Sequence, residues 1–231
     1  MAQEAPPPLA DLLWFCVPDR EICRAATSVA ASGNGSVRFA FHSSGALSSR
    51  ELEPLSKQGI AAASVHPLMT FVAGARPSLQ GVPFAIEGDG SAVRLARRLV
   101  HDLGGESFVV PAARKSAYHA WATMTSPLLL AFLVTLEDAA TLAGLSRAEA
   151  RRMSLPIIRQ TLENYARLGP EHSFSGPFIR GDAATVARHL SVLGKDPIVK
   201  TAYLALARSA LRRLPVKNRR ELARLAKGFP M

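Results

Sequence analysis

The stretch Leu12-Leu-Trp-Phe-Cys-Val17, followed by Pro18-Asp19 and the segment 20–31, decides the fold class. A short apolar run that contains two aromatic residues is typical of a strand buried on both faces, as the strands of parallel sheets are. Residues 20–31 have the pattern of a helix, and we expect Asp19 to be its N-cap. Strand followed by helix is the repeating unit of an α/β fold.

The same alternation continues to about residue 111. Further strands are predicted at 37–41, 60–65, 82–86 and 108–110, with helices at 48–57 and 91–103 between them. The first of these helices opens with the pattern of a capping box, Ser48-Ser-Arg-Glu51. Regular alternation of this kind predicts a parallel or mostly parallel sheet.

After Pro111 the pattern changes, and no further strand is expected. Helices are predicted at 113–143, with Pro127 as a candidate break in this first one, and at 146–168, 182–193, 197–213 and 217–227. Ser146 and Asp182 are the expected N-caps of two of them, and Pro156 is expected to kink the second helix. The predicted fold class is therefore α/β plus all-α, with an incomplete α/β domain over residues 1–112 and an all-helical domain over 113–231.

The positive charge of the chain is concentrated in its second half. The net charge is +10, and residues 145–231 hold 17 Lys and Arg against 6 Asp and Glu, whereas residues 1–144 hold 11 against 12. A basic half can bind a polyanion. Because the cations are spread over several predicted helices and no aromatic residues are interleaved for base stacking, solvated helix faces are the favoured interpretation, and nucleic acid is not an expected partner.

The sequence is that expected of a cytoplasmic protein. The stretch 1–8 has neither the basic nor the apolar region of a signal peptide. The longest apolar run, 127–136, is half of the roughly 20 residues that a membrane span needs. Cys16 and Cys23 have no metal or redox spacing, so we expect reduced thiols.

Unusual residues follow three of the predicted strands at the point where each strand ends. These are Val17, Pro18 and Asp19, then His42, Ser43, Ser44 and Gly45, and last His66 and Pro67. Because α/β sheets bind ligands beyond the carboxyl ends of their strands, these turns predict a ligand site. Either histidine alone could be a hydrogen-bonded loop residue, but two at successive strand ends favour a site. No metal spacing is present, and no metal site is predicted.

A polar stripe lies along the first helix of the second part. Lys115 and His119 are four residues apart and share a helical face, which Thr123 and Ser126 continue. Such a stripe on an otherwise apolar helix should face a wet cleft. Lys115 could then polarise a substrate carbonyl, and His119 could act as general acid–base or position the substrate. The alternative is that Lys115 extends to solvent at the helix start and His119 bonds a neighbouring carbonyl.

Five stretches taken together resemble a known family. They are 14–22, 42–48, 64–71, 115–119 and 175–182. They are similar to stretches of the Rossmann-like NADP-dependent oxidoreductases with a C-terminal helical domain of unknown function, which are related to ketopantoate reductase, pyrroline-5-carboxylate reductase and the 3-hydroxyacid dehydrogenases. The resemblance covers about residues 9–227.

The resemblance implies NADP as cofactor, bound near the strand-end residues Val17, Pro18, Asp19, His42, Ser43, Ser44, Gly45, His66 and Pro67. It implies Lys115 and His119 as catalytic residues, a small-molecule substrate, and a homodimer through the helical domain. Ser126 stands near the place of a family asparagine and is a candidate substrate-binding residue. Arg180, in the loop 176–182, is suited to a substrate carboxylate, or else pairs with a neighbouring acid.

The chief departure from the family is at the start of the chain. Family members begin with a strand, a glycine-rich turn, a helix and a second strand, which together amount to roughly 60 residues. No G-x-G-x-x-G occurs in this sequence. We therefore expect an N-terminally truncated oxidoreductase of a small keto, hydroxy or imino acid, ketopantoate-like as the leading guess, whose cofactor binding and activity need the absent unit. The alternative is a non-catalytic dimeric binding or scaffold protein.

Overall fold

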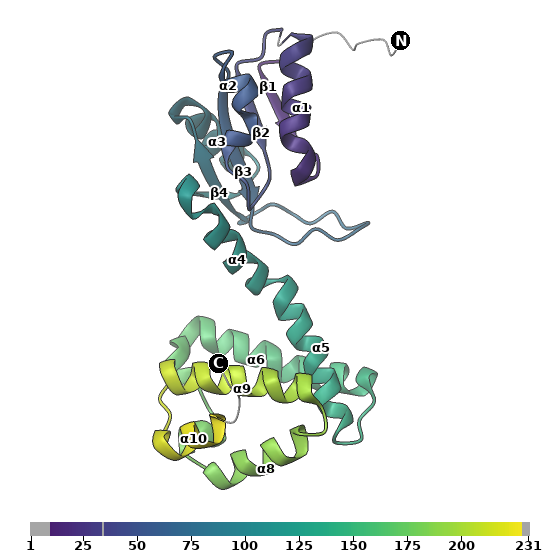
Figure 1. The fold of residues 1–231 in the computed structure, drawn as a ribbon, viewed down its shortest axis with the longest axis vertical. Helices are drawn as coiled ribbons and strands as arrows, with labels where there is room; N and C mark the ends of the chain where they lie inside the picture. The colour runs from purple at the N-terminus through teal and green to yellow at the C-terminus, as the bar shows by residue number, and fades with distance from the viewer. Residues whose placement is uncertain (1–9, 34, 228–231) are drawn as a thin grey trace. The chain divides into compact units, whose positions relative to one another are not determined.

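The computed structural model describes residues 10–33 and 35–227 (Figure 1). The contacts divide the chain into two compact units, Met1–Ser126 and Pro127–Met231. The stretch 1–8, on which the prediction about a signal peptide depends, lies outside the described residues. Each unit has its own arrangement of secondary structure.

The first unit is built on one five-stranded sheet. The strands are β1 (Leu12–Phe15), β2 (Phe39–His42), β3 (Ala61–Pro67), β4 (Pro83–Gly88) and β5 (Glu106–Val109), and they lie in that order across the sheet. All neighbouring pairs are parallel except β3 and β4, which are antiparallel. The predicted mostly parallel sheet is confirmed, and the direction of β4 is the feature that the sequence pattern did not reveal.

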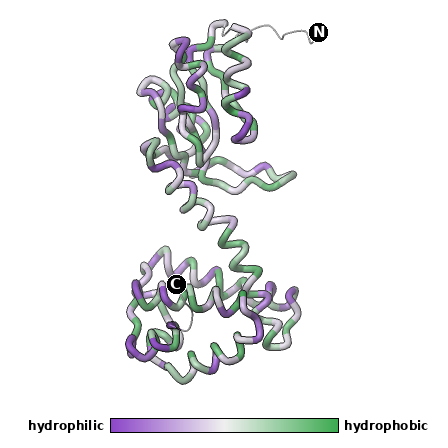
Figure 2. Tube along the Cα trace, in the orientation of Figure 1, coloured by the Kyte–Doolittle hydropathy of each residue, from purple (hydrophilic) through white to green (hydrophobic). Residues whose placement is uncertain are grey.

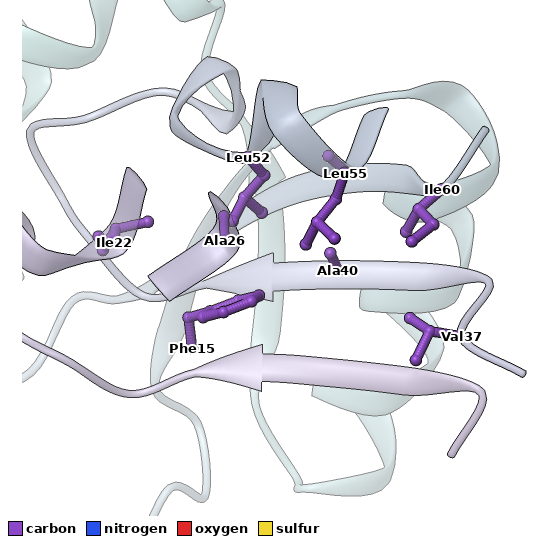
Figure 3. Close-up of a cluster of buried hydrophobic side chains, with 9 residues drawn as sticks. Phe15, Ile22, Ala26, Val37, Ala40, Leu52, Leu55 and Ile60 are labelled. Carbon is purple, nitrogen blue, oxygen red and sulfur yellow. The ribbon is translucent and has the colours of Figure 1, made fainter. Parts of the chain in front are cut away.

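Helices cover both faces of this sheet. They are α1 (Asp19–Ser32), the short 3-10 helix η1 (Ser49–Leu52), α2 (Glu53–Ser56) and α3 (Gly90–Asp102). The 3-10 turn η2 (Ala112–Arg114) and α4 (Lys115–Thr125) follow the last strand. On one face, Phe15 and Ala40 of the sheet pack against Ile22 of α1 and Leu55 of α2 (Figure 3). On the other face, Phe41 and other sheet residues pack against α3. Two buried layers of this kind give the sheet its hydrophobic cores.

The second unit contains only helices among the residues described. They are α5 (Pro127–Thr141), α6 (Arg147–Ser173), α7 (Pro177–Arg180), α8 (Ala183–Leu193), α9 (Pro197–Arg213) and α10 (Arg219–Ala226). The core of the unit joins α8, α9 and α10 through Val186, Leu204, Leu211 and Leu222. Ser146 forms the predicted capping box with Glu149, and Asp182 accepts a hydrogen bond from the Thr185 backbone as the predicted N-cap of α8.

The expected helix 113–143 is divided at Ser126-Pro127. Ser126 leaves the helical conformation with φ −125° and ψ −73°, because a proline disfavours the helical conformation in the residue before it. The sequence boundary was expected at 112/113, whereas the compact units divide after Ser126. The difference arises because α4 packs on the sheet through the buried side chains of Lys115 and Tyr118.

Three local predictions were wrong. Asp19 begins α1 instead of capping it, and the N-cap position is Pro18. Ser48 stands at the N-cap position but makes no side-chain capping hydrogen bond, and the Ser49 backbone N–H donates to the Glu87 carboxylate. α6 keeps helical angles at Pro156 and departs from them at Gly169, where φ is 75°.

One helical run has the length and composition of a membrane span, although the apolar-run criterion had predicted none. The run Ala112–Thr141 has a mean hydropathy of 1.4 in its most apolar window, and 6% of that window is buried within the chain. By length and composition alone, such a run is weak evidence of a membrane. Figure 2 shows the apolar colouring of its second half, α5.

Candidate functional site

The face of the sheet that α1 and α2 cover becomes polar as the strands approach their ends. Alternate residues of a strand share a face, so Ala40 and His42 on β2 point to the same side, as do Ala62 and Ser64 on β3. The two alanines lie in the hydrophobic core of that face. His42, Ser64 and the adjacent Glu87 of β4 are also buried, so the apolar core continues directly into a buried polar cluster.

Lys115 closes this cluster from α4. Its ammonium group donates to the Ser44 carbonyl oxygen at 2.8 Å and to Ser64 Oγ at 2.7 Å. Ser64 Oγ in turn donates to the same Ser44 oxygen at 3.0 Å. The lysine thus ties the first helix after the sheet to the turn after β2 and to the middle of β3.

The environment of Lys115 differs from the wet cleft that its helical position predicted. Its side chain is only 2% exposed. Burial lowers the pKa of Lys115 to about 8, while the carboxylates of Glu87 and Asp19 act in the opposite direction. Neither carboxylate forms an ion pair with it within 4.0 Å in the described part of the chain. Lys115 is therefore a buried cation whose direct partners are neutral.

The turn after β2 is held by its own side chains. His42 Nδ1 accepts the Ser44 backbone N–H at 3.1 Å, and His42 Nε2 lies 3.0 Å from the Ser48 carbonyl oxygen, to which it donates. Ser44 Oγ donates to Asp19 Oδ2 at 2.7 Å and accepts the Leu47 backbone N–H at 3.0 Å. Because both ring nitrogens of His42 are used inside the turn, its side chain shapes the turn and has none left for a ligand.

Two further imidazoles reach the same turn. His66 Nδ1 lies 2.7 Å from the hydroxyl of Tyr118, and the rings of His66 and His119 are 6.1 Å apart. Burial, and then the charges of Lys115 and His119, lower the pKa of His66 to about 4, so its ring is neutral at pH 7. Both rings lie so close to Gly45 that a Cβ on this residue would overlap with them. The structure thus brings together the predicted residues of the second and third strand ends with Lys115 and His119.

Three members of the cluster were not predicted from the sequence. Ser64 and Glu87 lie inside strands, where a polar residue in a buried β pattern is the only available signal. Tyr118 lies one turn after Lys115, and that spacing could have placed it on the same helical face. Its hydroxyl group forms a hydrogen bond with His66.

The remaining predicted residues lie apart from this cluster or in the second unit. Val17 and Pro18 line a hollow of about 440 Å³ with Glu21 and Arg24. Ser126 is the C-cap residue of α4, and Arg180 is the last residue of α7. No group of three or more metal-binding side chains that could hold an ion occurs in residues 10–33 and 35–227.

Replacing Gly45 with alanine tests how tightly the two imidazoles hold the turn. An added Cβ would stand 2.6 Å from His119 Cδ2 and 2.7 Å from His66 Nε2, so both rings must move. We expect an unfolding free energy lower by about 1–3 kcal/mol, the usual effect of overpacking. Urea denaturation measures it, with Gly90→Ala as control, since Gly90 has no positive φ and its added Cβ would meet only an ordinary contact of 3.6 Å with Arg94. Equal stability of wild type and Gly45→Ala would show that the rings are loosely held.

Comparison with known proteins finds one matching family and several solved structures of similar fold. A family model described as a domain of unknown function (DUF2520) matches residues 82–210 of the 231. No curated protein matches the chain. Protein TM1727 from Thermotoga maritima, whose structure has been solved, is 27% identical, with a TM-score of 0.69 over 93% of this chain and 78% of that one.

Two solved structures that carry functional names are more distant. BF3122 from Bacteroides fragilis, assigned as an NADP oxidoreductase, is 18% identical, with a TM-score of 0.71 over 88% of this chain and 76% of that one. The pyrroline carboxylate reductase of Plasmodium falciparum, solved with NADP bound, is 13% identical, with a TM-score of 0.55 over 94% and 74%. At these identities the likeness shows the fold, and the predicted Rossmann-like sheet followed by a helical part is confirmed.

Proposed function

This chain belongs to the DUF2520 family, and we propose that it is an NADP-dependent reductase or dehydrogenase of a small keto, hydroxy or imino acid. The observation that carries the proposal is the convergence of Lys115, His66, Tyr118 and His119 on the turn after β2. In α/β folds, ligands bind beyond the carboxyl ends of parallel strands, which is where this turn lies. The NADP-linked names of the distant structures agree with it.

The residues present fit one end of the cofactor and not the other. The strand-end turns offer hydroxyl, imidazole and backbone groups of no net charge, which suit the nicotinamide amide and its ribose. The first turn of α1 carries Asp19 and Glu21, and its N-cap position is a proline. Carboxylates at a helix N-terminus oppose a phosphate, so the start of α1 does not suit the diphosphate.

Within this proposal each polar residue has a distinct task. When bound, the reduced dinucleotide supplies a hydride to the substrate carbon. His119, which is half-buried at the edge of the cluster, is placed to give or take the proton of the substrate oxygen or nitrogen. Lys115, held behind the turn, favours negative charge that develops on the substrate. A keto acid such as ketopantoate remains the leading substrate.

A cofactor titration tests the proposal directly. Trp14 Nε1 donates to Ser43 Oγ at 2.8 Å, so a nicotinamide ring at this turn should change Trp14 emission. We expect saturable changes with NADPH, and reduced nicotinamide mononucleotide should bind about as well, because the start of α1 does not suit the diphosphate. A Trp14→Phe variant, which keeps Trp121, should lose the signal. Absence of binding by both compounds, together with no reduction of 2-oxo acids or cyclic imines, would contradict the proposal.

We further propose that the protein is a homodimer through its helical unit. Ten large apolar side chains of α5 and α6 are at least 39% exposed. They are Leu128, Leu129, Leu130 and Val134 on α5, and Met153, Leu155, Ile157, Leu162, Tyr165 and Leu168 on α6. An apolar surface on two helices that pack together marks a protein interface, and a second copy offers the same chemistry.

Charging this surface should weaken the dimer. Leu130 is 63% exposed, so Leu130→Asp should leave the unit folded while it places a carboxylate in the proposed interface. We expect the dimer dissociation constant to rise at least about tenfold. Sedimentation velocity measures it, with Ser209→Asp, at an exposed polar position on α9, as control. A monomeric wild-type protein at all concentrations would exclude this assembly.

A further inference from the structure

Tyr118 and His66 form an isolated hydrogen-bonded pair. The Tyr118 hydroxyl lies 2.7 Å from His66 Nδ1, and the two rings meet edge to face with centroids 5.5 Å apart. Tyr118 is 8% exposed. Within residues 10–33 and 35–227, its hydroxyl has no other hydrogen-bonding partner than this imidazole nitrogen.

The chemistry of the pair decides which atom holds the proton. If His66 Nδ1 carried the hydrogen, the phenol would accept it, and the proton of the phenol would have no acceptor among the described residues. Leaving a buried donor unpaired is unfavourable, and an imidazole nitrogen is a better acceptor than a phenol oxygen. Tyr118 therefore donates to Nδ1, and the hydrogen of the neutral His66 ring must be on Nε2.

His66 Nε2 faces the site. It lies 2.7 Å from the position that a Cβ on Gly45 would occupy, at the turn after β2. It has no hydrogen-bonding partner among the described residues. The buried polar atoms without a partner in this part of the chain do not include it, so it is in contact with solvent. The buried ammonium group of Lys115 lies behind the same turn. An exposed N–H next to a fixed positive charge is suited to an acceptor oxygen.

We propose that Tyr118 holds His66 as its Nε2–H tautomer and thereby makes His66 the hydrogen-bond donor for a carbonyl or carboxylate oxygen of the substrate. Tyr118 is then a positioning residue that acts through His66, and His66 is the residue that touches the substrate. The part that concerns the substrate rests on the proposed reductase function, whereas the tautomer does not. The same tautomer occurs at His42, where the Ser44 backbone N–H takes the place of the phenol.

The tautomer can be measured without any assay of activity. In nitrogen-15 NMR of the full chain at pH 7.5, the His66 resonances, identified by their loss in His66→Gln, should show a protonated Nε2 and an unprotonated, hydrogen-bonded Nδ1. In Tyr118→Phe the Nδ1 resonance should move to that of a free imine nitrogen. Tyr203→Phe is the matched control, because Tyr203 makes an equivalent bond of 3.0 Å to His189 and should change only His189. A protonated Nδ1 in the wild type would overturn the inference.

The donor role is tested with sodium pyruvate as a probe. We expect pyruvate to shift the His66 Nε2–H resonance saturably, and Tyr118→Phe to weaken this binding by about tenfold, the equivalent of one ordinary hydrogen bond. If the tautomer is as stated but pyruvate leaves Nε2–H unchanged, the donor role is wrong. If pyruvate binds as expected but no NADPH-dependent turnover is found, the proposed function fails, whereas the tautomer and the binding of an acceptor oxygen by His66 stand.

Discussion

Replacing Lys115 with methionine should remove a rise in stability with pH that the wild-type protein shows between pH 7 and pH 10. Burial places the pKa of Lys115 at about 8 in the folded chain, against 10.5 for an unperturbed lysine. Between these values the unfolded chain carries a proton that the folded chain has released. Because the unfolded state then binds more protons, the unfolding free energy increases as the pH rises.

The change of the unfolding free energy with pH follows from the protonation of Lys115 in the folded and unfolded states. Below pH 8 both states are protonated, and the folded state bears the full unfavourable free energy of a buried charge. Above pH 10.5 both are neutral and that penalty is gone. We expect the wild type to gain about 2 kcal/mol from pH 7 to pH 10. Methionine fills a similar volume without charge, and Ser64 still donates to the Ser44 oxygen in its absence.

Urea denaturation at several pH values between 7 and 10 measures the effect, taken as the difference between wild type and Lys115→Met. The difference removes contributions of other titrating groups, among them Tyr118, whose pKa burial raises to about 12. At pH 7 the variant should be as stable as the wild type or more so, since a well-packed apolar side chain often replaces a buried charge without loss. If the unfolding free energies of the two proteins changed in parallel with pH, the pKa of Lys115 would not be lowered in the folded chain.

Much of the fold could be read from local patterns. Apolar runs such as 12–17 and 37–41 predicted the strands, because a strand buried on both faces needs apolar residues throughout. Ser146 and Asp182 predicted helix starts, because their side chains satisfy backbone N–H groups that no residue of the helix can. These signals depend only on residues within one or two turns, so a single sequence contains them.

The candidate site was only partly predictable, because its chemistry depends on register. Asp19 has the sequence context of an N-cap, yet it accepts from Ser44, 25 residues away. Glu87 reaches Ser49 only because β4 runs antiparallel to β3 and sets Glu87 beside Ser64. The burial of Lys115 follows from the same arrangement, since its neutral partners come from the turn after β2 and from the middle of β3. No local pattern specifies such pairings.

Gly88, where the end of β4 pairs with β3, should be the position at which a single added methyl group lowers the stability of the fold most. Gly88 ends β4 with φ 140°, a conformation that residues with a side chain rarely adopt. A Cβ there would stand 2.2 Å from the Ala62 carbonyl oxygen and 2.6 Å from Ala63 Cα. Both are backbone atoms of the neighbouring strand, so no side chain can rotate away, and the two strands must separate.

Gly88→Ala should therefore lower the unfolding free energy by about 3–5 kcal/mol, the sum of overpacking and backbone strain. The flanking residues add to the loss, because Glu87 binds the Ser49 backbone N–H and Asp89 Oδ2 accepts the Ala62 N–H at 2.8 Å. Gly59→Ala is the matched control: its φ is 84°, but nothing lies within 4 Å of its added Cβ, so backbone strain of about 1 kcal/mol should be its whole effect. Urea denaturation of both variants separates the two contributions. Equal losses of unfolding free energy in the two variants would mean that backbone strain alone acts at Gly88. The close approach of β3 and β4, which sets Glu87 beside Ser64, would then not be what stabilises the buried cluster.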